Sequence, residues 1–173
     1  MGKNLIITEK PSVAMEFAKA LKINTNRKNG YLESDKWIIT WCVGHLVTMS
    51  YPEKYDENLK FWRLDTLPFI PKEWKYEIIP AVANQFNIIK TLLQREDIDE
   101  IYNAGDSGRE GEYIQRLVFM MAKPNPKAEM KRVWIDSQTE EEIKRGIEEA
   151  KSSKEYDSLS DSAYLRAKED YLI

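Results

Sequence analysis

Apolar residues recur along the chain at two spacings, which predict alternating strands and helices. Short apolar runs bounded by turn residues are typical of strands. The strands are predicted at 4–9, 31–35, 37–43, 98–104 and 130–135. The helices, where apolar residues lie three and four apart, are predicted at 11–21, 81–95, 109–122, 139–151 and from about 154 onward. This order predicts an α/β fold with a mostly parallel central sheet, right-handed crossovers and flanking helices.

Two stretches depart from this pattern. Residues 24–30 are polar and predict a turn, whereas residues 44–74 are long and irregular, with three prolines. A loop of that length in a compact domain is usually functional or packs as a layer of its own. The final helical stretch is closed by neither glycine nor proline, which favours a chain that continues beyond Ile173.

The most informative segment, Gly105 to Glu112, directly follows the predicted strand 98–104 and contains three acids, one arginine and three glycines. Glu9 follows the first predicted strand in a similar setting. Parallel α/β sheets bind ligands outside the carboxyl ends of their strands, so we expect both segments to form one site. Carboxylates hold hard divalent cations such as Mg²⁺, and an arginine beside a helix N-terminus can hold a phosphate.

The acids of this segment divide into different roles. Asp106 ends a strand and is expected to hold Mg²⁺ together with Glu9 or Glu110. Glu110 and Glu112 are two positions apart and cannot face one point of a regular helix. We therefore favour Glu110 as the ligand, directly or through water, while Glu112 caps the helix or pairs with Arg109. The alternative is purely structural: Asp106 is an N-cap, and the glutamates complement the helix dipole.

Three further side chains can contribute to the chemistry. Crowding by other carboxylates raises the pKa of a group such as Glu9, which suits a proton donor to a leaving oxygen. Lys10 offers a mobile cation for a phosphate, and otherwise it is a solvated surface lysine. His45, the only histidine, is interpreted equally well as a structural residue or as a substrate contact.

The composition limits the class of protein. The chain has 173 residues, 42% of them hydrophobic and 32% charged, which suits a single soluble domain. No apolar run is long enough to span a membrane, and the single Cys42 suits a reducing compartment, so we expect a cytoplasmic protein. The net charge of −3 argues against a stand-alone nucleic-acid binder. If the chain acts on DNA, other parts of a larger protein supply many of the phosphate contacts.

Three motifs in order resemble the Toprim domain of type IA DNA topoisomerases, and most of all its topoisomerase III branch. They are Glu9-Lys10-Pro11-Ser12, Gly44-His45-Leu46 and the segment Asp106-x-x-Arg109-Glu110-Gly111-Glu112. The resemblance covers nearly the whole chain and implies a Rossmann-like Toprim fold with an added hairpin and long loop. It places the Toprim domain at 1–151, and residues 152–173 in a helical segment that leads into a further domain.

The resemblance also implies Mg²⁺-dependent passage of DNA strands through a transient single-strand break. Glu9 matches the acid that protonates the leaving 3′ oxygen, and Lys10 matches a lysine near the scissile phosphate. Asp106 and Glu110 match metal-site acids, with Arg109 and Glu112 supporting them. The expected substrate is single-stranded DNA, or DNA with single-stranded regions, in the bacterial nucleoid.

The chain departs from the family pattern in two respects. Gly108 stands where the motif has a second aspartate, which predicts weaker or simpler metal binding. The family's nucleophile is a tyrosine of a separate domain, and none of the nine tyrosines here lies in a matching segment. We therefore expect this chain alone neither to cleave nor to relax DNA. The alternatives are another Toprim enzyme, such as a primase or a nuclease, and a non-catalytic nucleic-acid-binding module.

Overall fold

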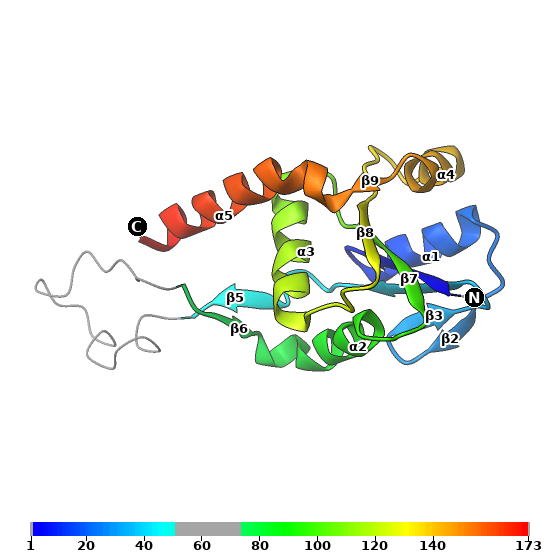
Figure 1. The fold of residues 1–173 in the computed structure, drawn as a ribbon, viewed down its shortest axis with the longest axis horizontal. Helices are drawn as coiled ribbons and strands as arrows, with labels where there is room; N and C mark the ends of the chain where they lie inside the picture. The colour runs from blue at the N-terminus through cyan, green and yellow to red at the C-terminus, as the bar shows by residue number, and fades with distance from the viewer. Residues whose placement is uncertain (1, 51–73, 173) are drawn as a thin grey trace, which may run out of the picture.

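The computed structural model describes residues 2–50 and 74–172, which form an α/β domain (Figure 1). The strands are β1 (Lys3–Thr8), β2 (Asn26–Lys28), β3 (Tyr31–Glu33), β4 (Trp37–Trp41), β5 (Val47–Met49), β6 (Tyr76–Ile78), β7 (Ile98–Ala104), β8 (Glu129–Arg132) and β9 (Lys151–Ser152). The α-helices are α1 (Pro11–Ala20), α2 (Ala83–Leu93), α3 (Arg109–Ala122), α4 (Glu140–Glu148) and α5 (Asp157–Leu172). Two short 3₁₀ helices, Pro80–Val82 and Ser153–Tyr156, precede α2 and α5.

Seven strands form the main sheet in the order β2-β3-β4-β1-β7-β8-β9. The four central strands, β4, β1, β7 and β8, run parallel to one another, and antiparallel strands flank them at both edges. Their carboxyl ends therefore lie along one edge of the sheet. The prediction of an α/β fold with a mostly parallel central sheet is confirmed.

Helices cover both faces of the sheet (Figure 1). The strand β1 is apolar on both sides, with Leu5 and Ile7 facing one layer and Ile6 facing the other. Leu5 and Ile7 pack with α2, α3 and α5, whereas Ile6 packs with α1 and α4. All three side chains have no exposed surface, as a central parallel strand requires.

Several short elements differ from the prediction. The polar segment 24–30 contains β2, an exposed edge strand that pairs with β3, and β9 adds a two-residue strand beside β8. Strand β8 ends at Arg132, three residues before the predicted end. The strands β2 and β9 contain no apolar residue, so no apolar pattern marks them in the sequence.

The predicted loop 44–74 also contains a strand near its start. Residues Val47–Met49 form β5, which pairs with β6 in a separate two-stranded sheet. The prediction for residues 51–73 lies outside the described part of the chain. Figure 1 shows the β5–β6 pair extending away from the main sheet beside α3.

Helix α5 lies across α3 and reaches the β5–β6 pair. The Tyr164 ring packs edge-on against Tyr113 of α3 at 5.1 Å between centroids, and the Tyr171 hydroxyl donates to the carbonyl of Ser50 at 2.8 Å. These contacts hold the end of the described chain against the domain core. None of the helices built from residues 2–50 and 74–172 is long and apolar enough to cross a membrane.

Candidate functional site

Two adjacent parallel strands bring the first and third motifs together. In the register of β1 against β7, Thr8 pairs with Ala104, so the two strands end side by side. Glu9 follows Thr8 directly, and Asp106 lies two residues beyond Ala104. The topology thus places both acids at the carboxyl edge of the sheet, where α/β folds bind their ligands.

A small cavity of about 130 Å³ opens at this edge. The three acids expected to hold a metal, Glu9, Asp106 and Glu110, all line it. The remaining lining residues are Gly44, Gly105, Gly111, Ile114 and Gln115. Glu9 thus lines one cavity together with two acids that lie about a hundred residues later in the sequence.

Glu9 is the partly buried acid of the three, whereas Asp106 and Glu110 are exposed. Burial raises the pKa of the Glu9 carboxyl, and repulsion from Asp106 raises this pKa further, against a smaller lowering by Lys10. Glu9 thus holds its proton to a higher pH than an ordinary glutamate, which suits a proton donor.

The acids of the cavity fit one magnesium ion that takes only one or two ligands from the protein. Among the described residues, no three or more His, Cys, Asp or Glu side chains are close enough to hold a metal ion together. Magnesium keeps several of its waters and takes one or two carboxylates, so Glu9 and Asp106 are a sufficient pair. A cation between them would also relieve the repulsion that raises the pKa of Glu9.

A larger groove of about 590 Å³ lies next to the cavity, between β5, α3 and α5. Glu110 lines both the cavity and the groove. His45 lies in the groove, where its Nε2 is 2.7 Å from Oε1 of Glu110. Arg109 also lines the groove, and its guanidinium donates to the Ser162 hydroxyl on α5 at 3.2 Å.

The positively charged side chains expected at the site therefore lie in two different places. Lys10 is exposed and close enough to Glu9 to lower its pKa. Arg109 faces α5 and does not line the cavity of the acids, so within the described residues it belongs with His45 to the groove. The structure thus places Glu9, Asp106 and Glu110 around one cavity, and Arg109 and His45 in the groove beside it.

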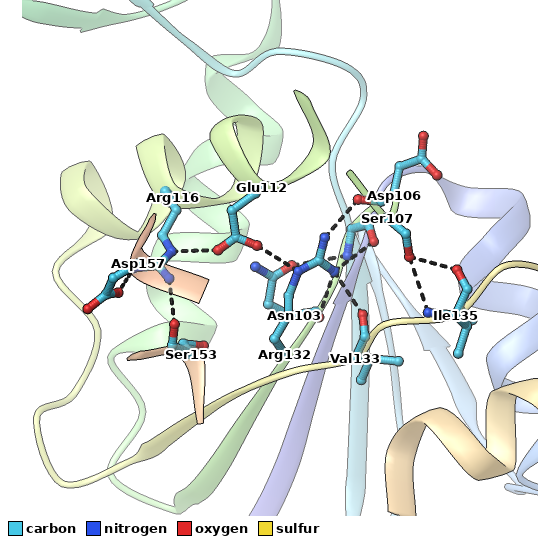
Figure 2. A network of polar contacts seen from close by, with 11 residues as sticks. Asn103, Asp106, Ser107, Glu112, Arg116, Arg132, Val133, Ile135, Ser153 and Asp157 are labelled. Atoms are coloured by element: carbon cyan, nitrogen blue, oxygen red, sulfur yellow. Dashed lines mark hydrogen bonds and ion pairs between the residues drawn. The ribbon is translucent and has the colours of Figure 1, made fainter. Parts of the chain in front are cut away.

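Glu112 is fully buried and forms two ion pairs, which Figure 2 shows in the centre of a polar network. Its Oε2 accepts from Arg132 at 2.7 Å, and its Oε1 accepts from Arg116 at 2.6 Å. The prediction that Glu112 caps the helix or pairs with Arg109 is wrong. The reason is that Glu112 points into the core from α3, whereas Arg109 is exposed and bonded to α5. Glu112 can support the site but has no exposed surface with which to contact a ligand.

The buried Arg132 side chain holds the backbone of the acidic turn. It donates to the carbonyl of Asp106 at 2.7 Å and to the carbonyl of Gly105 at 2.9 Å. Figure 2 shows the Asp106 carboxylate pointing away from this guanidinium. Arg132 therefore holds the main chain of Asp106 and leaves its side chain available.

Arg132 was not predicted as a site residue. The available signal was a charged residue beside Val133 in an apolar strand pattern, which requires a buried partner. Its partner, Glu112, lies 20 residues earlier and on another element, so the pairing depends on the tertiary fold.

The turn itself is shaped by two glycines. Gly108 has φ of +127°, a conformation that L side chains rarely adopt, and it is the N-cap of α3. The interpretation of Asp106 as an N-cap is therefore wrong. A Cβ on Gly111 would lie 1.9 Å from the Asp106 carbonyl oxygen, so only glycine permits this close approach of helix and turn.

The fold and the site define a class of protein: an α/β domain with an acidic cavity at the carboxyl ends of two adjacent parallel strands. The model of the Toprim domain family matches residues 4–137, and the chain belongs to this family. The expected Rossmann-like Toprim fold is thereby confirmed.

Similar proteins cover the whole of this chain. It is 42% identical over 173 residues to the DNA topoisomerase 3 of Bacillus subtilis and 44% identical over 173 residues to that of Bacillus cereus. It is 43% identical over 171 residues to the DNA topoisomerase 3 of Staphylococcus aureus. The chain spans only 23–24% of the length of these relatives, so the comparison concerns one part of each.

Replacing Arg132 by methionine is expected to destabilise the domain by about 3–5 kcal/mol, because it removes one partner of a buried ion pair. The measurement is urea unfolding followed by circular dichroism. Lys131→Met is the control: Lys131 forms a partly exposed pair with Glu100 at 3.2 Å, worth about 0–1 kcal/mol. Equal losses in both variants would contradict the central role of the Arg132 contacts.

Introducing a second acid by Gly108→Asp is expected to cost about 1–3 kcal/mol of folding free energy, because φ of +127° strains any L side chain. Gly108→Ala should lose a similar amount, since a Cβ at this position meets nothing within 4 Å. Urea unfolding of both variants checks the expectation. An aspartate variant as stable as the parent chain would show that the turn accepts the family's second carboxylate without strain.

Proposed function

We propose that this chain is the N-terminal Toprim part of a Mg²⁺-dependent type IA DNA topoisomerase of the topoisomerase III kind. In this proposal it forms half of a site that cleaves and rejoins one DNA strand. The nucleophilic tyrosine belongs to a further domain of the same polypeptide, so the chain alone neither cleaves nor relaxes DNA.

The observation that carries the proposal is the cavity lined by Glu9, Asp106 and Glu110. It supports the proposal because these acids match the positions at which the type IA family places its proton donor and its metal-site acids. The relatives named DNA topoisomerase 3 add support, since they align with the chain over 99–100% of its length.

Glu9 is proposed as the general acid of strand cleavage. When the tyrosine oxygen attacks the phosphorus, its own proton passes to solvent. The bond from phosphorus to the 3′ oxygen breaks, and the Glu9 carboxyl gives its proton to that oxygen. The raised pKa of Glu9 keeps this proton available. Lys10, exposed beside Glu9, is proposed to hold the scissile phosphate by its charge.

Glu9 and Asp106, with Glu110 directly or through water, are the residues that would hold Mg²⁺. The bound ion supplies positive charge that orients the DNA phosphate and offsets its charge. Glu112 acts only through Arg132, as a positioning residue for the turn that carries Asp106.

Single-stranded DNA is proposed to reach the acids along the 590 Å³ groove. Arg109 and Arg166 line this groove and can pair with phosphates, and Tyr113 and Tyr171 line it with aromatic surface. His45 is proposed as a further contact to the DNA backbone. Residues 152–173, which contain α5, are proposed to connect this domain to the next one.

Asp106→Asn is expected to weaken Mg²⁺ binding by at least about tenfold, because it removes one of two carboxylates that a magnesium site needs. Isothermal titration calorimetry of Mg²⁺ into the 173-residue chain measures this. The control is Asp35→Asn, which changes an exposed aspartate in the turn between β3 and β4. Unchanged binding in Asp106→Asn would reject the metal site and favour a non-catalytic nucleic-acid-binding module.

Glu9→Gln is expected to slow supercoil relaxation by the complete enzyme about 100-fold or more, because a positioned general acid contributes about 10²–10⁴-fold. Glu16→Gln, an exposed position on α1, should keep the parent rate. A Glu9→Gln enzyme that relaxes DNA at the parent rate would remove Glu9 from the mechanism. A complete polypeptide without relaxation activity would favour the primase or nuclease alternative.

A further inference from the structure

The cavity of the acids contains one buried polar group to which the proposed mechanism gives no role. Gln115 of α3 is only 1% exposed, and its side chain lines the cavity with Glu9, Asp106 and Glu110. Its Oε1 is buried and has no hydrogen-bond partner in the described part of the chain. A buried oxygen without a partner costs stability, so such an atom in a native fold calls for a ligand or a bound water.

The orientation of this amide is set by its surroundings. The Nε2 donates to the Thr8 carbonyl at 3.4 Å and faces the Cys42 sulfur at 3.7 Å. Exchanging nitrogen and oxygen would place the amide oxygen against the Thr8 carbonyl, where two acceptors repel each other. The nitrogen therefore faces the end of β1, and the oxygen remains as the acceptor to be satisfied.

The Gln115 side chain is also held close to the acidic turn. A Cβ on Gly105 would lie 2.6 Å from the Gln115 Cγ, so glycine at this position allows the amide to reach the turn. Gly111, which lines the same cavity, precedes Gln115 by four positions and hence lies on the same face of α3. Backbone and helix together present this side chain to the cavity.

We propose that Gln115 Oε1 is a neutral oxygen acceptor of the metal site and binds a water of the hydrated cation held by Glu9 and Asp106. This inference rests on the proposed function and refines its metal site. Magnesium keeps most of its waters, and such waters need acceptors with fixed positions. A neutral amide supplies one at a site where Gly108 provides no carboxylate, and it adds no negative charge beside Glu9 and Asp106.

The test uses Mn²⁺, a paramagnetic ion that prefers the same oxygen ligands as Mg²⁺. Its affinity for the 173-residue chain is measured by electron paramagnetic resonance and by calorimetry. Gln115→Met keeps the size of the side chain and replaces the amide by a weak acceptor. We expect the affinity to fall about tenfold or more, as happens when an outer partner of a metal site is lost.

A second variant, Gln115→Glu, has the same shape and keeps an oxygen at the Oε1 position. We expect it to bind Mn²⁺ at least as tightly as the parent chain at pH 8. Gln94→Met serves as the matched control, since the Gln94 amide donates to the Ala122 carbonyl at 2.7 Å and does not line the cavity. Urea unfolding without metal establishes that each variant is folded.

The outcomes separate the two proposals. If the parent chain binds Mn²⁺, Asp106→Asn weakens binding and Gln115→Met does not, the role of Gln115 is wrong and the metal site stands. Weaker binding in both Gln115→Met and Gln115→Glu also overturns it, because a role of side-chain fit would then explain the loss. If the parent chain binds no Mn²⁺, the metal site itself fails.

Discussion

The buried ion pair between Glu112 and Arg132 is the interaction on which the site depends. Both side chains have no exposed surface, and an unpaired charge in such a position is strongly unfavourable. Each charge is therefore tolerated only while its partner is in place. Because Arg132 also donates to the carbonyl of Asp106, the position of the acidic turn is fixed by the same pair. Arg116 extends the network to Asp157 at the start of α5 (Figure 2).

This network acts on acids that the sheet already places side by side. The parallel pairing of β1 and β7 puts Glu9 and Asp106 at neighbouring strand ends, and the apolar layers on both faces keep those strands in register. The sheet sets which acids meet, and the Arg132 contacts set the conformation of the turn that carries one of them. Ser107 contributes in the same way, since its hydroxyl donates to the Ile135 carbonyl at 2.6 Å. Asp106, an exposed acid on a turn, thus obtains a fixed position from the groups behind it.

The sequence allowed the central strands, the helices and the meeting of Glu9 with Asp106 to be predicted, because these depend on local periodicity and on one rule for parallel sheets. The short strands β2, β5, β6 and β9 escaped prediction, since β2 and β9 contain no apolar residue and β5 and β6 have only three residues each. The pairing of Glu112 could not be predicted from the sequence for another reason. Its choice of Arg132 over Arg109 depends on which side of α3 faces the core, and Arg132 comes from a strand 20 residues later.

Gly108 and the amide of Gln115 both limit the negative charge around Glu9. Asp106 raises the pKa of Glu9, and a further carboxylate close to Glu9 would raise this pKa more. A second aspartate at 108 would bring more negative charge to the turn and would require a backbone that Gly108, at φ of +127°, does not have. The neutral amide oxygen of Gln115 instead adds a hydrogen-bond acceptor without adding negative charge beside Glu9 and Asp106. In this chain, the pKa of the Glu9 carboxyl thus depends on how few carboxylates lie close to it.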